Sequence, residues 1–233
     1  MGIYELPLTL PVLEEGPCNI VLFPGIKENG SRSTRRIMRL YETYETIRVL
    51  KPGEIDSIFP TTQYRNNVEF AWIEDYENGV FTTLASNKNT TLDSITVIDS
   101  SHVNAFKDGI SRYSGKFKIP AQNDMVYFEH ASAESFILPR QGRDVYLEVD
   151  YKTNVPLQIG IWAQQIQFDE QIPFIVLNPT ERWNKIYINL TIETSALDPN
   201  TPVRIFYGVF KQQGDTKTSP EVYLDNIKLA YLN

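Results

Sequence analysis

The chain has 233 residues, of which 42% are hydrophobic and 12% aromatic, so it can bury one large core or two smaller ones. Its formal net charge of −7 arises entirely after residue 67, because residues 1–67 hold 8 basic and 8 acidic side chains. This acidity argues against nucleic acid as a partner, since phosphate binding needs a basic surface. No apolar run approaches the roughly 20 residues that span a bilayer.

The single cysteine, Cys18, excludes a disulfide within the chain. Cys18 lies between Pro17 and Asn19, and it is not preceded by the apolar run expected before a lipid-modified or cleaved cysteine. Met1 and Gly2 lead directly into strand-like sequence. Two interpretations follow, a cytoplasmic protein or a mature or recombinant form, and the second is favoured because of the fold resemblance described below.

Residues 1–67 contain about four extended apolar segments: Ile3–Leu13, Cys18–Phe23, Leu40–Leu50 and Ile55–Tyr64. The first holds two prolines, each of which lacks a backbone donor, so it is expected at a sheet edge or as a strap. Threonine and tyrosine in the third favour strand over helix. We therefore expect a small N-terminal β-domain over residues 1–67, ending at the polar Arg65–Asn67.

A basic patch runs from Ser33 to Arg39 and contains Arg35, Arg36 and Arg39. Such a run is typical of a solvated loop, and that interpretation is favoured. The functional alternative is the binding of an anion or of a partner. The sequence leaves the role of these arginines open.

An acidic turn at residues 74–79 places Glu74, Asp75 and Glu77 within four positions. Hard cations such as calcium prefer carboxylate and carbonyl oxygens, but the spacing is not that of an EF-hand loop. As a bare cluster, the turn is favoured to be solvated.

The second part of the chain alternates apolar and polar residues with a period of two, which predicts strands with one buried and one wet face. These segments are Val145–Tyr151, Leu157–Ala163 and Ile186–Ile192. Val203–Phe210 is apolar on both faces and should be central or covered. No apolar period near 3.6 persists over three turns, so the fold class is all-β, with residues 68–233 forming a β-sandwich domain.

In the last segment, Glu221–Leu232, the apolar residues change from even-numbered to odd-numbered positions part-way along. Val222 and Leu224 have one parity, whereas Ile227 and Leu229 have the other. A regular strand cannot bury both sets on one side. A β-bulge at Asp225–Asn226 would restore the phase and redirect the Asp225 side chain. The alternative is a strand buried on both faces without a bulge.

Catalytic chemistry is not evident in the sequence. The two histidines, His102 and His130, lie on separate segments, and no serine sits in a strand–turn–helix setting. Zinc-ligand spacing and phosphate-binding glycine loops are absent. Carboxylates are plentiful, which leaves a glycosidase pair open. We nevertheless expect a protein that is not an enzyme.

From Trp72 onward the chain resembles the jelly-roll, galactose-binding-like β-sandwiches of secreted carbohydrate-binding modules and of bacterial surface lipoproteins. The similarity lies in the order and spacing of short motifs: Asp75–Gly79, which is similar to the family's D-F-E-x-G, Ser114–Lys116, Tyr146–Lys152, Trp183–Ile188 and Tyr223–Lys228. The resemblance implies a jelly-roll β-sandwich preceded by a small β-domain.

Two site predictions follow from this resemblance. In such modules a structural calcium ion joins the first and last strands, which implies Glu77 and Asp225 as metal ligands. Sugar binding implies an exposed aromatic platform, and Trp162, between Gln158 and Gln164, is the candidate for ligand binding. The alternative is that Trp162 packs beneath the N-terminal domain or a loop.

Three functional hypotheses remain. The first is a non-catalytic binding protein for a glycan or protein ligand, at the bacterial cell surface or in the periplasm, associated with the outer membrane by a lipid anchor outside this sequence. The alternative is a structural or scaffolding lipoprotein subunit of an envelope complex. The third is a glycan-active enzyme. A pocket of aromatics and amides would favour the first, and a broad exposed apolar patch the second.

Overall fold

The computed structural model describes residues 2–79, 83–85, 95–119, 127–165, 169–215 and 217–233. Strands account for 48% and helix for 3% of the chain, which confirms the all-β fold class. The elements are β1 (Gly16–Leu22), β2 (Gly25–Lys27), β3 (Arg35–Ile37), β4 (Tyr44–Leu50), β5 (Val68–Glu74), β6 (Thr83–Ala85), β7 (Ile95–Asp99), β8 (Tyr113–Lys118), β9 (Tyr127–Ser132), β10 (Val145–Thr153), β11 (Leu157–Gln164), β12 (Asp169–Leu177), β13 (Asn184–Asn189), α1 (Thr191–Ala196), β14 (Val203–Phe210) and β15 (Glu221–Leu232).

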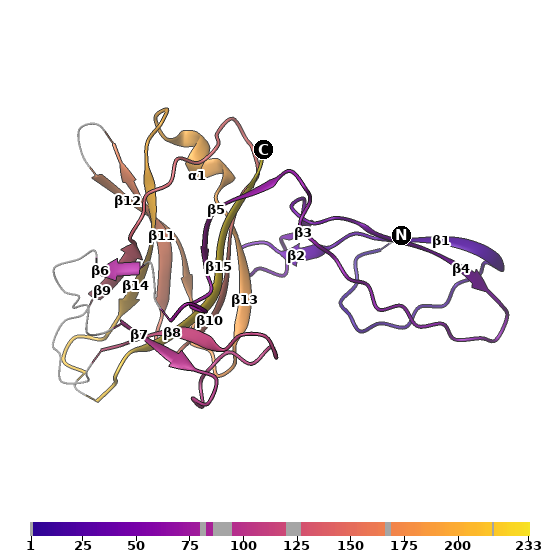
Figure 1. Ribbon diagram of the computed structural model, residues 1–233, viewed down its shortest axis with the longest axis horizontal. Helices are drawn as coiled ribbons and strands as arrows, with labels where there is room; N and C mark the ends of the chain where they lie inside the picture. The colour runs from indigo at the N-terminus through magenta and orange to yellow at the C-terminus, as the bar shows by residue number, and fades with distance from the viewer. Residues whose placement is uncertain (1, 80–82, 86–94, 120–126, 166–168, 216) are drawn as a thin grey trace.

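Two antiparallel sheets pack face to face and form the jelly-roll sandwich that the resemblance implied (Figure 1). One sheet has six strands, in the order β13-β10-β15-β8-β7, with β5 also paired to β15. The other has five, in the order β12-β11-β14-β9-β6. A single apolar core fills the space between them, and both inner faces contribute to it.

The alternating segments supply this core as predicted. Val145, Leu147 and Val149 of β10 are buried between the sheets, as are the apolar residues of β11. The strand that is apolar on both faces, β14, lies between β11 and β9 in the middle of its sheet. The alternation of apolar and polar residues therefore predicted correctly which side of these strands faces the core.

The β-bulge in the last strand is confirmed. Between the pairs Glu148–Lys228 and Asp150–Asp225, β10 has one residue and β15 has two. Asn226 adopts a left-handed backbone conformation with a φ of 46°. Consequently Leu224 and Ile227 both face the core although their parities differ. On its other side β15 changes partner here, from β8 up to residue 224 to β5 from residue 227.

The predicted strand Ile186–Ile192 is wrong beyond Asn189. The Asn189 Oδ1 atom accepts a hydrogen bond from Thr191 N, and the chain then turns into the short helix α1. Ile192 is 78% exposed rather than buried in the sandwich. This local hydrogen bond from the backbone to the Asn189 side chain turns the chain out of the strand, because asparagine side chains compete with sheet pairing in this way.

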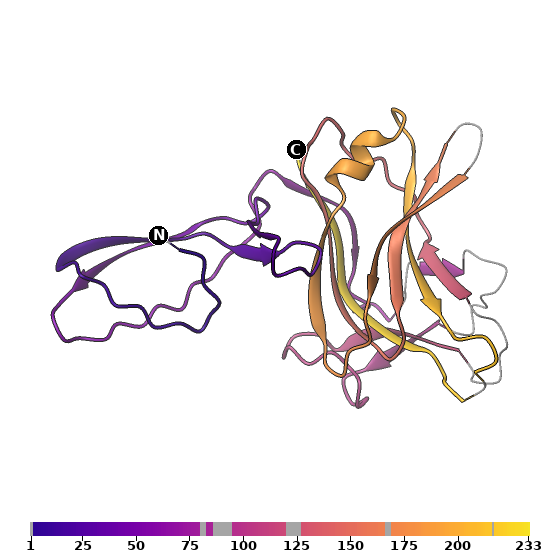
Figure 2. The same ribbon diagram turned by 180° about the vertical axis from the view of Figure 1, so that it is seen from behind.

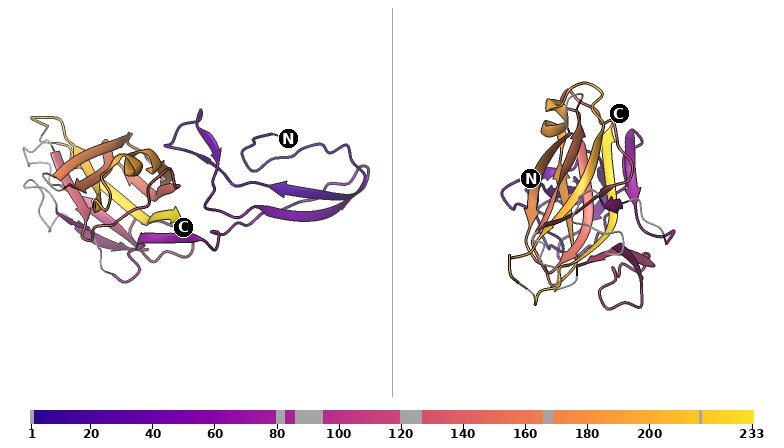
Figure 3. Two further views of the ribbon diagram at one scale, coloured as in Figure 1. Left: turned by 90° about the horizontal axis from the view of Figure 1, so that it is seen from above. Right: turned by 90° about the vertical axis from the view of Figure 1, so that its left-hand side faces the viewer.

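Residues 2–67 leave the sandwich as a narrow extension (Figures 1 and 2). Its outer part, here called the arm (residues 2–23 and 44–62), contains the two-stranded ribbon of β1 and β4. Its inner part, here called the root (residues 24–43 and 63–67), contains β2 and β3. The view from above shows the same projection (Figure 3, left). The expected strand at Ile55–Tyr64 does not form, apart from one bridge between Tyr64 and Tyr41. Ile3–Leu13, expected at a sheet edge or as a strap, forms no strand.

The root packs on the outer face of the six-stranded sheet. Ile26, Met38 and Leu40 of the root form a second apolar core with Tyr146 and Ala230 of the sandwich. This contact corrects the prediction that the polar parity of β10 is wet. Glu148 and Asp150 are buried on that face, where the root and the neighbouring strands cover them. The division of the chain at residue 67 stays a prediction.

The buried Glu148 is matched by polar partners from both sides of this contact. Tyr41 of the root donates a hydrogen bond of 3.0 Å to its carboxylate, and Lys185 lies 3.5 Å away. Burial is the main cause that raises the pKa of Tyr41, and the nearby Glu148 charge adds to it. The hydroxyl therefore stays protonated and acts as a permanent donor, which ties the root to the sheet.

Candidate functional site

The outer face of the five-stranded sheet carries the sequence-predicted binding residues. Ile159 and Ile161 of β11 point into the core, so the opposite parity of that strand faces outward. Cross-strand pairing then places Trp162 beside Gln171 of β12 and Arg204 of β14. Aromatic, amide and charged side chains thus share one surface of the sandwich.

A buried carboxylate orients the aromatic groups on this surface. Trp162 Nε1 donates a hydrogen bond of 2.7 Å to Glu129 Oε1. Tyr127 Oη and Gln171 Nε2 both donate to Glu129 Oε2. Desolvation and the neighbouring Glu129 carboxylate raise the pKa of Tyr127, so its hydroxyl remains a donor. The indole and phenol rings are therefore fixed in orientation before any ligand arrives.

Two glycines let the rings lie close to the sheet. A Cβ atom on Gly208 would lie 2.5 Å from Tyr127 Oη, and one on Gly160 would lie 2.5 Å from Phe206 Cε1. Both glycines belong to the outward parity of their strands. The missing side chains let the Tyr127 ring and the fully buried Phe206 ring lie against the backbone of the sheet.

The three predicted ligand-binding residues lie together on β11. Gln158, Trp162 and Gln164 share the outward face and are each half-buried. No described residue hydrogen-bonds the side-chain amides of Gln158 and Gln164. The root packs on the other sheet, so Trp162 does not lie beneath the N-terminal region. The sequence did not reveal Tyr127 and Glu129, because they lie on β9, which is separated from β11 along the chain by β10. Gln171 lies on β12, the next strand after β11, where the sequence analysis predicted no strand.

The two predicted calcium ligands both bond to residues at the start of β8. Glu77 accepts hydrogen bonds from the backbone nitrogens of Arg112 and Tyr113, and Arg112 Nε lies 2.9 Å from its other oxygen. Asp225 is fully buried and accepts a hydrogen bond of 2.9 Å from Ser114 Oγ. Because Tyr113 and Ser114 are consecutive residues, β8 connects the turn that carries Glu77 to the last strand, which carries Asp225.

The fit of these residues to calcium is uneven. Burial raises the pKa of Asp225 to about 7, because its carboxylate loses water and gains few donors. A cation would offset that cost, which suits Asp225 as a ligand. Glu77 already has charged and backbone partners, and the described residues contain no group of three or more His, Cys, Asp or Glu side chains that could hold a metal. Calcium binding stays a prediction.

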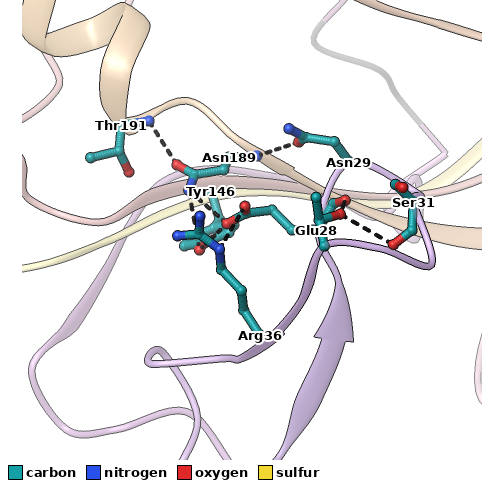
Figure 4. A network of polar contacts seen from close by, with 8 residues as sticks. Glu28, Asn29, Ser31, Arg36, Tyr146, Asn189 and Thr191 are labelled. Carbon is teal, nitrogen blue, oxygen red and sulfur yellow. Dashed lines mark hydrogen bonds and ion pairs between the residues drawn. The ribbon is translucent and has the colours of Figure 1, made fainter.

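The basic patch has a defined structural setting at the root. Arg36 Nε lies 3.1 Å from Glu28 Oε2, and Glu28 is almost completely buried (Figure 4). Tyr146 Oη and Asn189 Nδ2 both donate to Glu28 Oε1, at 2.9 and 2.7 Å. Arg35 lies 2.7 Å from Glu5. The expectation of a loop is corrected, since residues 35–37 form β3 and pair with β2.

No protein-family model matches the sequence, and no curated protein matches it. Similar solved structures include TmCBM61 in complex with β-1,4-galactotriose, at 14% identity over 68% of this chain and 94% of that chain, with a TM-score of 0.41. They also include the family 11 carbohydrate-binding module of a Clostridium thermocellum cellulosomal cellulase, at 15% identity over 68% and 92%, with a TM-score of 0.41. A variant of CBM29-2 with cellulohexaose has 10% identity over 71% and 93%, with a TM-score of 0.40.

The β-sandwich fold of this chain is defined by its own two packed sheets and the apolar core between them. Among the described residues, no helix has the length and apolar character needed to cross a membrane.

Proposed function

We propose that this protein binds a glycan without cleaving it, on the outer face of the five-stranded sheet. The observation that supports the proposal is the Trp162 indole, which Glu129 orients between the amides of Gln158 and Gln164. Within the described part of the chain, neither amide has a hydrogen-bond partner. A sugar ring has an apolar face of C–H groups and a rim of hydroxyls. An aromatic ring suits the first, and amides that both donate and accept suit the second.

Glu129 acts in this proposal as a positioning group. Its carboxylate is fully buried and accepts hydrogen bonds from three side chains, so it holds the rings in place. Glycoside hydrolysis would instead need two carboxyl groups facing each other across the scissile bond. A non-catalytic role therefore suits this surface better than the enzymatic hypothesis.

We further propose that the protein lies at the bacterial cell surface or in the periplasm, with a lipid anchor outside this sequence.

Replacing Trp162 with alanine should weaken glycan binding by about tenfold or more, because a stacked aromatic contributes about 0.5–1.5 kcal/mol beyond its buried area. A glycan array should identify the ligand, and calorimetric titration should then compare the wild type with the variant. The control is Phe59→Ala, which removes an aromatic ring that is 86% exposed on the arm.

The outcome depends on whether the fold survives. A Trp162→Ala protein with an unchanged melting temperature and unchanged affinity would contradict the proposal. A variant that unfolds would show that Trp162 is a packing residue. The milder Trp162→Phe would then decide, because it keeps an aromatic face while losing the hydrogen bond to Glu129.

The scaffolding alternative is favoured by a separate observation on the arm. Many of its large apolar side chains are exposed: Ile3, Tyr4, Leu6, Leu8, Leu10, Val12, Leu13, Val21, Phe23, Ile47, Val49, Ile55 and Phe59. A two-stranded ribbon is only marginally stable alone. Such a broad apolar surface marks a protein-interaction site, so the second candidate function is attachment of the sandwich to a neighbouring subunit through the arm.

The Ile47→Glu variant should abolish that attachment while leaving the fold intact, because Ile47 is 70% exposed on β4. Crosslinking in envelope fractions should give one defined adduct for the wild type and lose it for the variant. Val103→Glu is the control, since Val103 is 83% exposed on the sandwich. Equal crosslinking by all three proteins would refute the scaffolding role.

A further inference from the structure

We propose that the junction between the root and the sandwich is a second binding site, which takes an acidic saccharide through a carboxylate or a sulfate ester. A surface pocket of about 340 Å³ lies here, lined by Arg36, Ile37, Arg39, Asp144 and Tyr146. Two arginines, one apolar side chain, one carboxylate and one aromatic ring thus share one small site, built from the root and from β10 and its preceding loop.

The Arg36 guanidinium is held in place with donors to spare. Its Nε atom lies 3.1 Å from Glu28 Oε2, and Tyr146 and Asn189 fix that carboxylate from the sandwich side (Figure 4). No described residue accepts a hydrogen bond from its Nη1 or Nη2 atom. A guanidinium has five donors arranged as a planar fork, which matches the paired oxygens of a carboxylate or sulfate.

Arg39 supplies a second guanidinium that is only loosely engaged. Its side chain is 74% exposed, and its Nη1 atom lies 3.5 Å from Asp144 Oδ2, beyond the usual hydrogen-bond distance. An ion pair this exposed contributes little to stability. An incoming oxyanion can therefore recruit Arg39 at small cost, in competition with Asp144.

The remaining lining residues suggest the rest of the ligand. The exposed Ile37 and the buried Tyr146 also line the pocket, so one apolar and one aromatic side chain border the charged groups. Asp144 can accept a hydrogen bond from a hydroxyl group. A molecule with an oxyanion, hydroxyls and an apolar ring face satisfies all of these groups together, and an acidic sugar has that chemistry.

This site is independent of the glycan surface around Trp162. The pocket belongs to the outer side of the six-stranded sheet, whereas Trp162 belongs to the five-stranded sheet. The basic segment 32–39 holds four arginines and no acidic residue, and among the described residues only three carboxylates, those of Glu5, Glu28 and Asp144, form ion pairs with them, so positive charge stays in excess here. Salt should weaken the attraction, since exposed charges are screened within about 10 Å at 0.1 M ionic strength.

The test is calorimetric titration of the full chain with tetragalacturonate, a sulfated galactose tetrasaccharide, neutral galactotetraose and sodium sulfate. We expect at least one acidic tetrasaccharide to bind, more tightly at 50 mM than at 300 mM NaCl, and the two acidic probes to show which oxyanion is preferred. Arg39→Gln should reduce the affinity about tenfold or more, as expected for hydrogen bonds between charged groups. Asp144→Asn should raise the affinity, because it removes the carboxylate that competes for Arg39.

The matched control is Lys51→Gln on the arm. The Lys51 side chain is similarly exposed, at 65%, and its ion pair has the same length of 3.5 Å. The substitution therefore removes one positive charge without touching the pocket. Its affinity should stay at the wild-type value. Arg36 is avoided because its loss would also leave the buried Glu28 without its ion pair.

Three results would overturn the proposal: neither acidic probe binds, Arg39→Gln and Lys51→Gln have the same affinity, or sodium sulfate saturates the site as tightly as the saccharides. Trp162→Ala separates this site from the proposed glycan surface. If that variant abolishes acidic binding and Arg39→Gln does not, the acidic sugar binds on the five-stranded sheet and the junction is not a site.

Discussion

Replacing Gly160 with alanine should lower the free energy of unfolding by about 2–3 kcal/mol, the upper range for overpacking a filled interior. The added Cβ atom would lie 2.4 Å from the Ile172 backbone oxygen and 2.5 Å from the Phe206 ring. The carbonyl belongs to β12, which pairs with β11 at this point. It cannot retreat without disturbing that pairing. Urea denaturation of the two proteins measures the difference.

Gly25→Ala is the control for this prediction. Gly25 also lies in a strand, but the nearest atom to its added Cβ would be the Arg36 oxygen at 3.8 Å, an ordinary contact. Its stability should change by less than about 0.5 kcal/mol. Equal losses for the two variants would mean that the close approach at Gly160 does not determine the stability of the five-stranded sheet.

Millimolar calcium should raise the melting temperature of the wild type by roughly 5–10 °C. Binding to the folded state alone contributes about 2.7 kcal/mol at a concentration 100 times the dissociation constant, and each kcal/mol corresponds to about 2–4 °C for a chain of this size. Asp225 is the predicted ligand whose buried carboxylate gains most from a cation. Asp225→Asn should therefore erase the calcium dependence, measured by thermal unfolding with calcium and with chelator.

Asp215→Asn serves as the control, because it removes an acidic side chain from an exposed turn and should keep the calcium response. A wild-type melting curve that calcium leaves unmoved would refute the metal site. Asp225 would then be a buried carboxyl group held by Ser114, with a structural role at the bulge.

Sequence reasoning found part of the candidate site. The parity of β11 was sufficient to place Gln158, Trp162 and Gln164 together, because alternate side chains on one strand share a face. The parity of one strand could not reveal Glu129. Its carboxylate reaches Trp162 Nε1 because β9 and β11 both lie beside β14 in the sheet. Cross-strand neighbours depend on strand order, and strand order is set by long-range packing.

The sequence by itself determined the all-β class and the buried parity of β10 and β11, and it located the candidate bulge in β15 that strand pairing then confirmed. Each follows from local alternation, which the pleat of a strand converts directly into an inner and an outer face. Only the tertiary structure decided the environment of the outer faces. Glu148 and Asp150 have the alternation of a wet face, yet the root and neighbouring strands bury them against Tyr41 and Lys185. Burial of a polar face depends on what packs over it, and no pattern within one strand encodes that partner.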